Sequence, residues 1–169
     1  MSLSLGMQKT ILYFVLGLVM TSCATIKNVS NKQVNQVLDD WHDAAARADY
    51  ETYFSLMTQN AVFIGTDATE NWSRTEFEAF SKPYFDRGKA WSFTPLERNI
   101  YTKNGITYFD ELLETQMGIC RGSGVLFVEN NQLKIAHYVL SIAVPNENVK
   151  SLTQLKKDWD QQYISKLKN

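Results

Sequence analysis

The sequence has 169 residues, of which 44% are hydrophobic and 21% are charged, and its formal net charge is -1. This length allows one globular domain with a sizeable hydrophobic core. Because lysine and arginine are scattered and the net charge is near zero, the composition argues against a nucleic-acid-binding protein, which needs clustered positive charge.

Residues 1–23 are typical of an export signal. Lys9 precedes an apolar run, Ile11–Met20, which is too short to span a bilayer but fits the core of a signal peptide. Small residues then lead to Cys23, and this pattern resembles the lipobox of bacterial lipoproteins. The resemblance implies that Cys23 is lipidated and anchors the chain to the cell envelope, facing the periplasm. An ordinary signal peptide cut nearby, or an uncleaved membrane anchor, is the alternative.

The two cysteines give little scope for a disulfide or a metal site. If Cys23 carries lipid, Cys120 is the only thiol left and cannot form an internal disulfide. Cys120 has no C-x-x-C partner, and the chain has only two histidines. We therefore expect neither a metal site nor a cofactor.

After a short polar tether at residues 24–30, the spacing of apolar residues predicts a helix that begins near Asn31. Its buried stripe includes Trp41. His42 lies at the edge of this stripe, and we expect it at the surface.

A second, shorter helix is predicted after Asp49, which can cap its first turn. A short strand is predicted at Ala61–Gly65, followed by a polar loop. The sequence Ser73-Arg74-Thr75-Glu76 is a capping box that opens a third helix. Pro83 is expected to kink that helix or end it early.

The second half of the chain changes to strand patterns. Four long strands are predicted, at residues 91–102, 106–115, 119–128 and 133–144. Asn104-Gly105 and Asn130-Asn131 are hairpin turn signals, because these residues tolerate positive φ. Short turns make consecutive strands antiparallel. Helices followed by such a meander indicate an α+β fold, with the helices on one face of a curved sheet.

The last strand, 133–144, is mostly apolar on both of its alternating faces. A strand with one solvated face should alternate more cleanly. We therefore expect the helices to cover one side of the sheet, and a second subunit or the C-terminal helix to cover the other.

These elements in this order resemble the nuclear transport factor 2 (NTF2)-like superfamily in its SnoaL-like branch, over about residues 34–145. The segments that carry the resemblance are AVFIGTD, SRTEFEAFSKPYF, TYFDE and RGSGVLFVENNQLKIAHYVLSIAVPN. It implies a cone-shaped half-barrel at 31–145, with three N-terminal helices on a curved antiparallel sheet, followed by an amphipathic helix at 146–169. It also implies a pocket between helices and sheet, and a homodimer through the outer sheet face.

The charged stretch around Glu111 suggests a polar cluster in that pocket. Asp110 and Glu111 are adjacent, so their side chains point to opposite faces and at most one enters the cone. A turn centred on Gln116 would place Glu111 opposite Arg121, which we expect, whereas a slip of one residue would place Glu111 opposite Gly122 instead. Such a cluster could also include His137.

Two interpretations of this cluster are open. Glu111 and His137 could be catalytic acid and base groups, oriented by Arg121. The alternative is a structural ion pair beside a histidine that is satisfied in the core. The pocket itself is expected to be aromatic, and each of its residues could equally be plain core: Trp41, Tyr53, Phe63, Tyr84, Trp91 and Tyr108.

The sequence thus supports three hypotheses for function. The first is a module that binds a small, mainly apolar molecule in its cone. The second is a small isomerase, cyclase or dehydratase that uses acid–base residues in the pocket. The third is a protein-interaction domain with a vestigial cavity. Because this superfamily hosts enzymes and non-catalytic modules alike, the resemblance does not choose between them.

Overall fold

The structure is a computed structural model, and it describes residues 29–169. The expected signal sequence at 1–23, the lipidation of Cys23 and most of the tether at 24–30 lie outside the described residues. Between residues 29 and 169, no helix combines the length and the apolar character that crossing a membrane requires.

Four α-helices and one short 3-10 helix are described: α2 (Asn31–Ala46), α3 (Tyr50–Ser55), α4 (Arg74–Asp86), η1 (Asn146–Asn148) and α5 (Val149–Lys168). The predicted caps are confirmed, since Asp49 caps α3 and Ser73 forms a capping box with Glu76 at the start of α4. The expectation that Pro83 ends the third helix early is wrong. The helix continues to Asp86, because Phe85 is buried and packs its last turn onto the core.

The strands are β1 (Met57–Ile64), β2 (Asn71–Ser73), β3 (Thr94–Lys103), β4 (Ile106–Thr115), β5 (Gly118–Glu129) and β6 (Gln132–Ile142). They form one curved sheet in the order β2-β1-β6-β5-β4-β3. The hairpin turns are confirmed, with positive φ at Asn104, Asn130 and Asn131. The sheet is mixed rather than wholly antiparallel, because β1 runs parallel to β6. β2 lies in the stretch predicted to be a loop.

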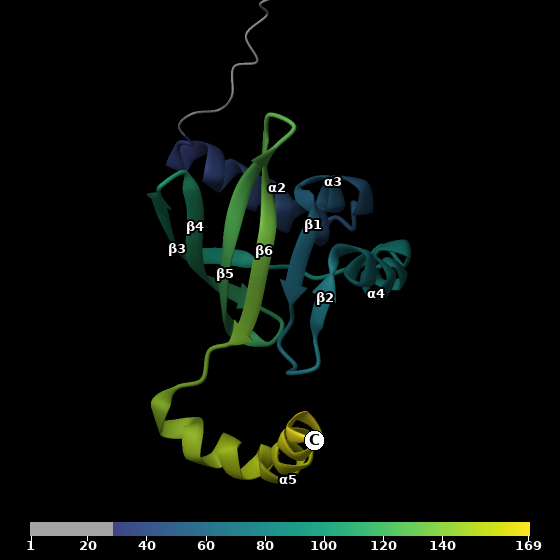
Figure 1. Ribbon diagram of the computed structural model, residues 1–169, viewed down its shortest axis with the longest axis vertical. Helices are drawn as coiled ribbons and strands as arrows, with labels where there is room; N and C mark the ends of the chain where they lie inside the picture. Colours follow the sequence, from purple (N-terminus) through teal and green to yellow (C-terminus); the bar gives the residue numbers. More distant parts are fainter. Residues whose placement is uncertain (1–28) are drawn as a thin grey trace, which may run out of the picture.

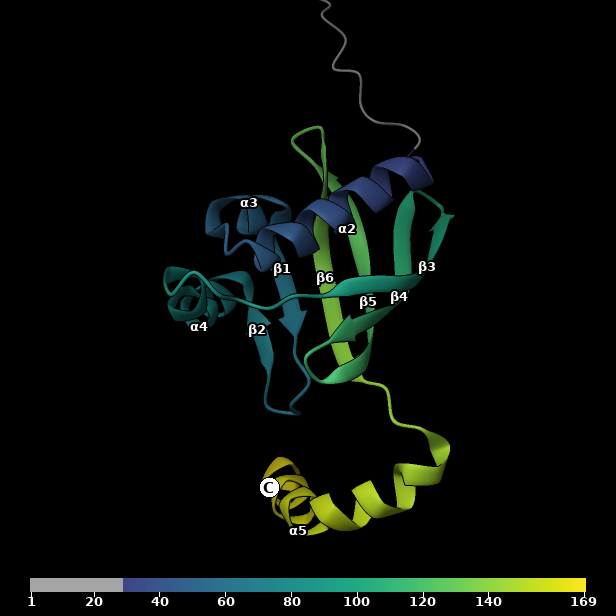
Figure 2. The same cartoon turned by 180° about the vertical axis from the view of Figure 1, so that it is seen from behind.

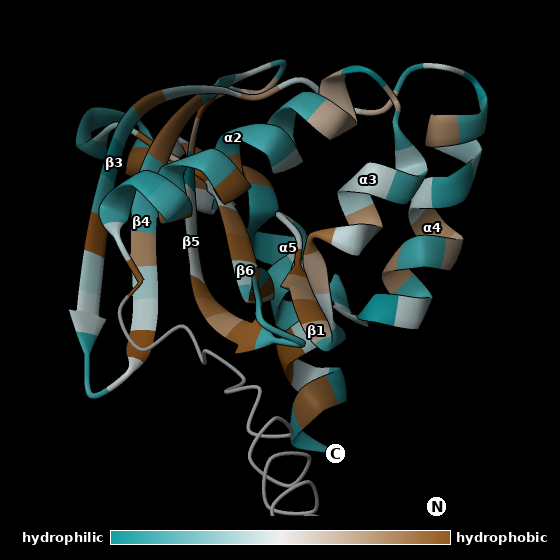
Figure 3. Cartoon of the chain, turned by 90° about the horizontal axis from the view of Figure 1, so that it is seen from above, coloured by the Kyte–Doolittle hydropathy of each residue, from teal (hydrophilic) through white to brown (hydrophobic). Residues whose placement is uncertain are grey.

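The predicted α+β half-barrel is confirmed. The helix α2 crosses the concave face of the sheet, and α3 and α4 lie beside β1 (Figures 1 and 2). Hydrophobic residues run along β4, β5 and β6 beneath α2 (Figure 3). The core thus lies between the sheet and these three helices, and the sheet stays open as a cone.

A β-bulge in β6 explains why this strand is apolar on both faces. The ladder with β5 shifts register so that Ala136 has no partner. Ile135 and Tyr138 are both buried although they are three positions apart, whereas His137 between them is only half-buried. The bulge therefore switches the face that the strand presents to the core, and it turns His137 to the outer face.

Candidate functional site

The carboxylate of Glu111 lies at the centre of a buried polar cluster. The inner face of β4 holds Glu111 between Phe109 and Leu113, and the Glu111 side chain is fully buried. One carboxylate oxygen, Oε1, lies 2.8 Å from Nε2 of His42 and accepts a 3.1 Å hydrogen bond from the Tyr138 hydroxyl.

The other carboxylate oxygen of Glu111 is bound by Arg98, which comes from the inner face of β3. Arg98 donates from Nε to Oε2 at 2.9 Å, and its Nη2 lies 2.9 Å from the same oxygen. At its far end, Nη1 donates to Asn35 at 3.0 Å and to Asp39 at 2.8 Å. Arg98 thus ties helix α2 to the sheet through a side chain that is 7% exposed.

The electrostatics of the cluster favour an ionised carboxylate. Burial of Glu111 opposes its ionisation, but the hydrogen bond and charge of His42, together with those of Arg98, outweigh it and lower the pKa of Glu111. Burial raises the pKa of the Tyr138 hydroxyl well above its usual value, and the neighbouring Glu111 raises it further. Tyr138 therefore stays protonated and can donate to Glu111.

The expected pairing of Glu111 with Arg121 is wrong. The β4–β5 turn contains Gln116 and Met117, so Glu111 lies opposite Gly122, in the one-residue slip considered above. Arg121 points outward, with its side chain 56% exposed, and its nearest carboxylate is that of Asp110 at 3.9 Å. Glu111 is thus the inward member of the Asp110–Glu111 pair.

The positions of the two histidines are the reverse of those expected. His42 is buried rather than at the surface, and it contacts Glu111. His137 lies on the outer face because of the bulge in β6, so the structure does not bring it to Glu111. A signal for His42 was present in the sequence, because His42 follows Leu38 by four residues and Leu38 belongs to the buried stripe.

A separate apolar cavity of about 190 Å³ opens at the end of the cone formed by the β1–β2 loop and the β4–β5 turn. Its aromatic walls come from β1, β2, α4 and the segment before β3: Phe63, Trp72, Phe77, Phe80, Tyr84, Trp91 and Phe93. The rest of the lining consists of Gly65, Thr66, Glu70, Gln116, Met117 and Leu140. The rings of Phe63 and Phe77 stack with their centroids 4.0 Å apart.

The expected pocket residues therefore divide into three groups. Phe63, Tyr84 and Trp91 line the cavity, as expected. Trp41 and Tyr53 are buried in the core, where their rings stack 4.8 Å apart behind the cavity wall. Tyr108 and Arg121 lie on the outer face of the sheet, where Tyr108 stacks on Tyr101 instead.

Comparisons with known proteins identify the domain. A family model described as SnoaL-like domain matches residues 34–145. No curated protein sequence matches significantly. An NTF2-like protein of unknown function from Pseudomonas putida is 10% identical, with a TM-score of 0.59 and 69% and 89% of the two chains covered.

Two further solved structures have the same fold. A candidate dehydratase of the NTF2-like family from Streptomyces avermitilis is 14% identical, with a TM-score of 0.58, and the match covers 68% of this chain and 96% of that one. The association domain of CaMKII from C. elegans is 19% identical, with a TM-score of 0.54, and 66% and 94% of the chains are covered. At these identities the likeness establishes the fold alone.

Proposed function

Because the chain belongs to the SnoaL-like domain family, as its match over residues 34–145 shows, we propose that the domain binds a small, mainly apolar molecule. The observation that carries this proposal is the open, aromatic-walled cavity of about 190 Å³ at the end of the cone. A cavity of roughly 150 Å³ takes up benzene. The proposed ligand is therefore a planar molecule of one or two fused rings.

The rim of the cavity favours a ligand with one polar group. Among the residues that line the cavity, Glu70 comes from the β1–β2 loop and Gln116 from the β4–β5 turn, whereas most of the others are aromatic. An apolar pocket with few polar groups is the usual composition of a small-molecule site. The ring system would lie against Phe63 and Phe77, with its polar group at the opening.

The acid–base hypothesis has less support from the geometry. Glu111 does not line the cavity. Both of its carboxylate oxygens are bound by protein groups, from His42, Tyr138 and Arg98. A general acid or base must reach the proton that it transfers, so we favour a binding function and a structural part for Glu111.

Narrowing the mouth is expected to abolish binding. Met117 lines the cavity from the β4–β5 turn and is partly exposed, so Met117→Trp can fill the opening without disturbing the core. A ligand of about ten non-hydrogen atoms at roughly 0.5 kcal/mol per atom binds near 0.2 mM. We expect calorimetric titration with 1-naphthol to give a dissociation constant of that order, weakened about tenfold or more by Met117→Trp.

Glu114→Trp is the matched control, since Glu114 is exposed on the same hairpin but does not line the cavity. It should bind 1-naphthol like the unaltered chain. Equal affinity in all three proteins would place the ligand elsewhere, and no saturation by any apolar ring probe would remove the binding proposal.

We further propose that two copies associate through the outer face of the sheet. That face exposes apolar side chains on three neighbouring strands, including Tyr101, Tyr108 and Phe127. Exposed apolar patches of this kind mark protein interfaces. The association domain of CaMKII from C. elegans has the same fold, which is consistent with association between copies of this domain.

The N-terminal pattern supports an envelope location. We propose that residues 1–23 direct export and that Cys23 receives the lipid that anchors the chain. Cells fed an alkyne-labelled fatty acid should incorporate it into the chain, and Cys23→Ser should remove the label completely. Cys120→Ser, at the buried thiol, should leave it unchanged. Label retained in Cys23→Ser would contradict the proposal.

A further inference from the structure

The helix α5 has an apolar stripe that its own chain leaves uncovered. The helix is 20 residues long, and none of its residues is buried. Its large exposed side chains include Leu152, Leu155, Trp159 and Leu167, and Leu155 is 84% exposed. Most helical stability in proteins comes from packing an apolar face rather than from the helix propensity of the sequence. A partner surface is therefore needed.

The domain of the same chain provides little of that surface. The helix lies apart from the ends of the strands (Figures 1 and 2). A gap of about 600 Å³, lined by Trp159 and by the β1–β2 loop, separates the two. The described contact across it is a single hydrogen bond, from the Tyr163 hydroxyl to the carbonyl of Ala68 at 3.3 Å.

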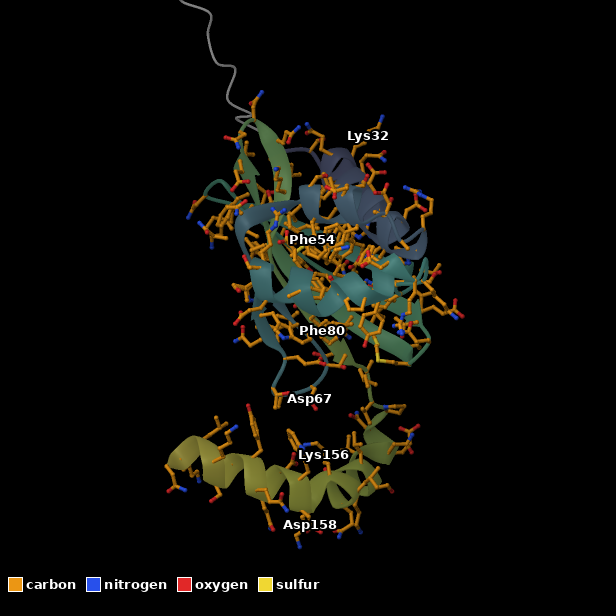
Figure 4. All side chains as sticks on the ribbon, turned by 90° about the vertical axis from the view of Figure 1, so that its right-hand side faces the viewer. Lys32, Phe54, Asp67, Phe80, Lys156 and Asp158 are labelled. Atoms are coloured by element: carbon orange, nitrogen blue, oxygen red, sulfur yellow. The ribbon has the colours of Figure 1, made fainter. Side chains whose placement is uncertain are left out.

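The charges identify the kind of surface that fits α5. Residues 149–169 carry five lysines and two aspartates, a net charge of +3, whereas residues 29–148 carry ten basic and sixteen acidic residues, a net charge of -6. Figure 4 shows Lys156 on the side of α5 that faces the domain, with Asp67 across from it. The best match for a basic helix is thus an acidic domain of this kind.

An anionic membrane fits this distribution less well. It would attract α5 but repel the acidic domain that is attached to it. A second copy of the chain has no such conflict, because each basic helix meets an acidic domain.

The second copy also supplies an apolar surface. Exposed apolar side chains on the outer sheet face include Tyr101, Ile106, Tyr108, Ile119 and Phe127. The chain leaves the sheet next to Ile119, because the amide of Ala143, just after β6, donates to the carbonyl of Ile119 at 2.9 Å. A two-fold axis would let each copy place its helix on the other, which buries both stripes at once.

We propose that α5 is exchanged between two copies, so that the stripe of Leu152, Leu155 and Trp159 in one copy packs on the outer sheet face of the other. This inference rests on the homodimer proposed above and adds α5 to its interface. Exchange of an element between identical chains requires a hinge. Residues 143–145 supply it, because they lie between β6 and η1 outside any helix or strand.

Cross-linking between differently tagged copies tests the exchange in the full chain. One copy carries Leu155→Cys, and the other carries Tyr108→Cys on the outer sheet face. Both positions are exposed in the single chain, so neither change should disturb folding. After treatment with a short bismaleimide in cells, we expect a product that contains both tags.

The matched control replaces Leu155→Cys by Gln161→Cys, which lies on the same helix outside the stripe of Leu152, Leu155 and Trp159. Because Gln161 lies about 120° around the helix from Leu155 and outside the apolar stripe, the mixed-tag product should fall about fivefold or more. Equal yields from Leu155 and Gln161 would overturn the exchange. A chain that carries both Leu155→Cys and Tyr108→Cys gives a second test. Cross-linking only within such a chain, and never between two copies, would mean that α5 folds onto its own domain and would also overturn the exchange.

Co-purification of the two tagged, otherwise unaltered copies separates the two proposals. If the copies co-purify and Leu155→Glu leaves their association unchanged, the homodimer stands and the exchange fails. Loss of association in Leu155→Glu but not in Gln161→Glu supports the exchange. If the unaltered copies do not associate, both the homodimer and the exchange are wrong.

Discussion

Replacing Arg98 by methionine is expected to lower the free energy of unfolding by about 3–5 kcal/mol. The guanidinium of Arg98 makes two contacts of 2.9 Å with one oxygen of Glu111, and the carboxylate is fully buried. Methionine fills a similar volume but leaves that oxygen without its partner, and removing one partner of a buried ion pair is costly. Urea unfolding followed by circular dichroism would measure the loss.

Arg121→Met is the matched control for Arg98→Met. The side chain of Arg121 is 56% exposed and lies 3.9 Å from its nearest carboxylate, that of Asp110. Exposed pairs of this kind contribute about 0–1 kcal/mol. The double variant Arg98→Met/Glu111→Leu should recover part of the loss, because it removes the unpaired carboxylate as well. Equal losses from Arg98→Met and Arg121→Met would contradict the structure.

The parts of the fold that could be predicted are those that local chemistry determines. Asp49 and Ser73 cap helices, because their side chains accept hydrogen bonds from the first helical turn. Asn104 and Asn131 mark hairpin turns, because asparagine tolerates positive φ. Each of these signals acts within a few residues, so the sequence displays it directly.

The register of the β4–β5 hairpin could not be read in this way. Its turn consists of Gln116 and Met117, which carry no turn signal, and the residue with positive φ is Gly118, which follows them. A shift of one residue reverses every side chain of a strand. The wrong register therefore placed Arg121 inside the cone, whereas the structure places it outside.

The buried cluster depends on contacts between elements far apart in the chain. Arg98 meets Glu111 across the β3–β4 hairpin, and it meets Asp39 on a helix 59 residues earlier. The bulge at Ala136 turns His137 outward, yet alanine is not a typical bulge residue, and the shift serves to bury Tyr138. The contacts of Arg98 and the position of His137 therefore follow from packing over the whole domain rather than from the local sequence pattern.

Replacing Gly124 by alanine is expected to lower the free energy of unfolding by about 3 kcal/mol. A Cβ atom at this position would lie 2.4 Å from the carbonyl oxygen of His137 and 2.9 Å from the ring of Phe109. The nearest atom belongs to the backbone of the neighbouring strand, so no rotamer change can relieve the clash. The strands would have to separate at the point where the sheet curves around the core.

Ser123→Ala is the matched control for Gly124→Ala, because Ser123 is adjacent in β5 and its side chain lies on the opposite face. It should change stability by less than about 0.5 kcal/mol. Alanine also restricts the unfolded chain more than glycine does, which favours folding by about 0.4–1 kcal/mol, so a measured loss in Gly124→Ala is a lower bound on the clash. A Gly124→Ala variant as stable as Ser123→Ala would mean that β5 and β6 do not approach each other as described. The bulge at Ala136 would then lose its support, and with it the outward position of His137.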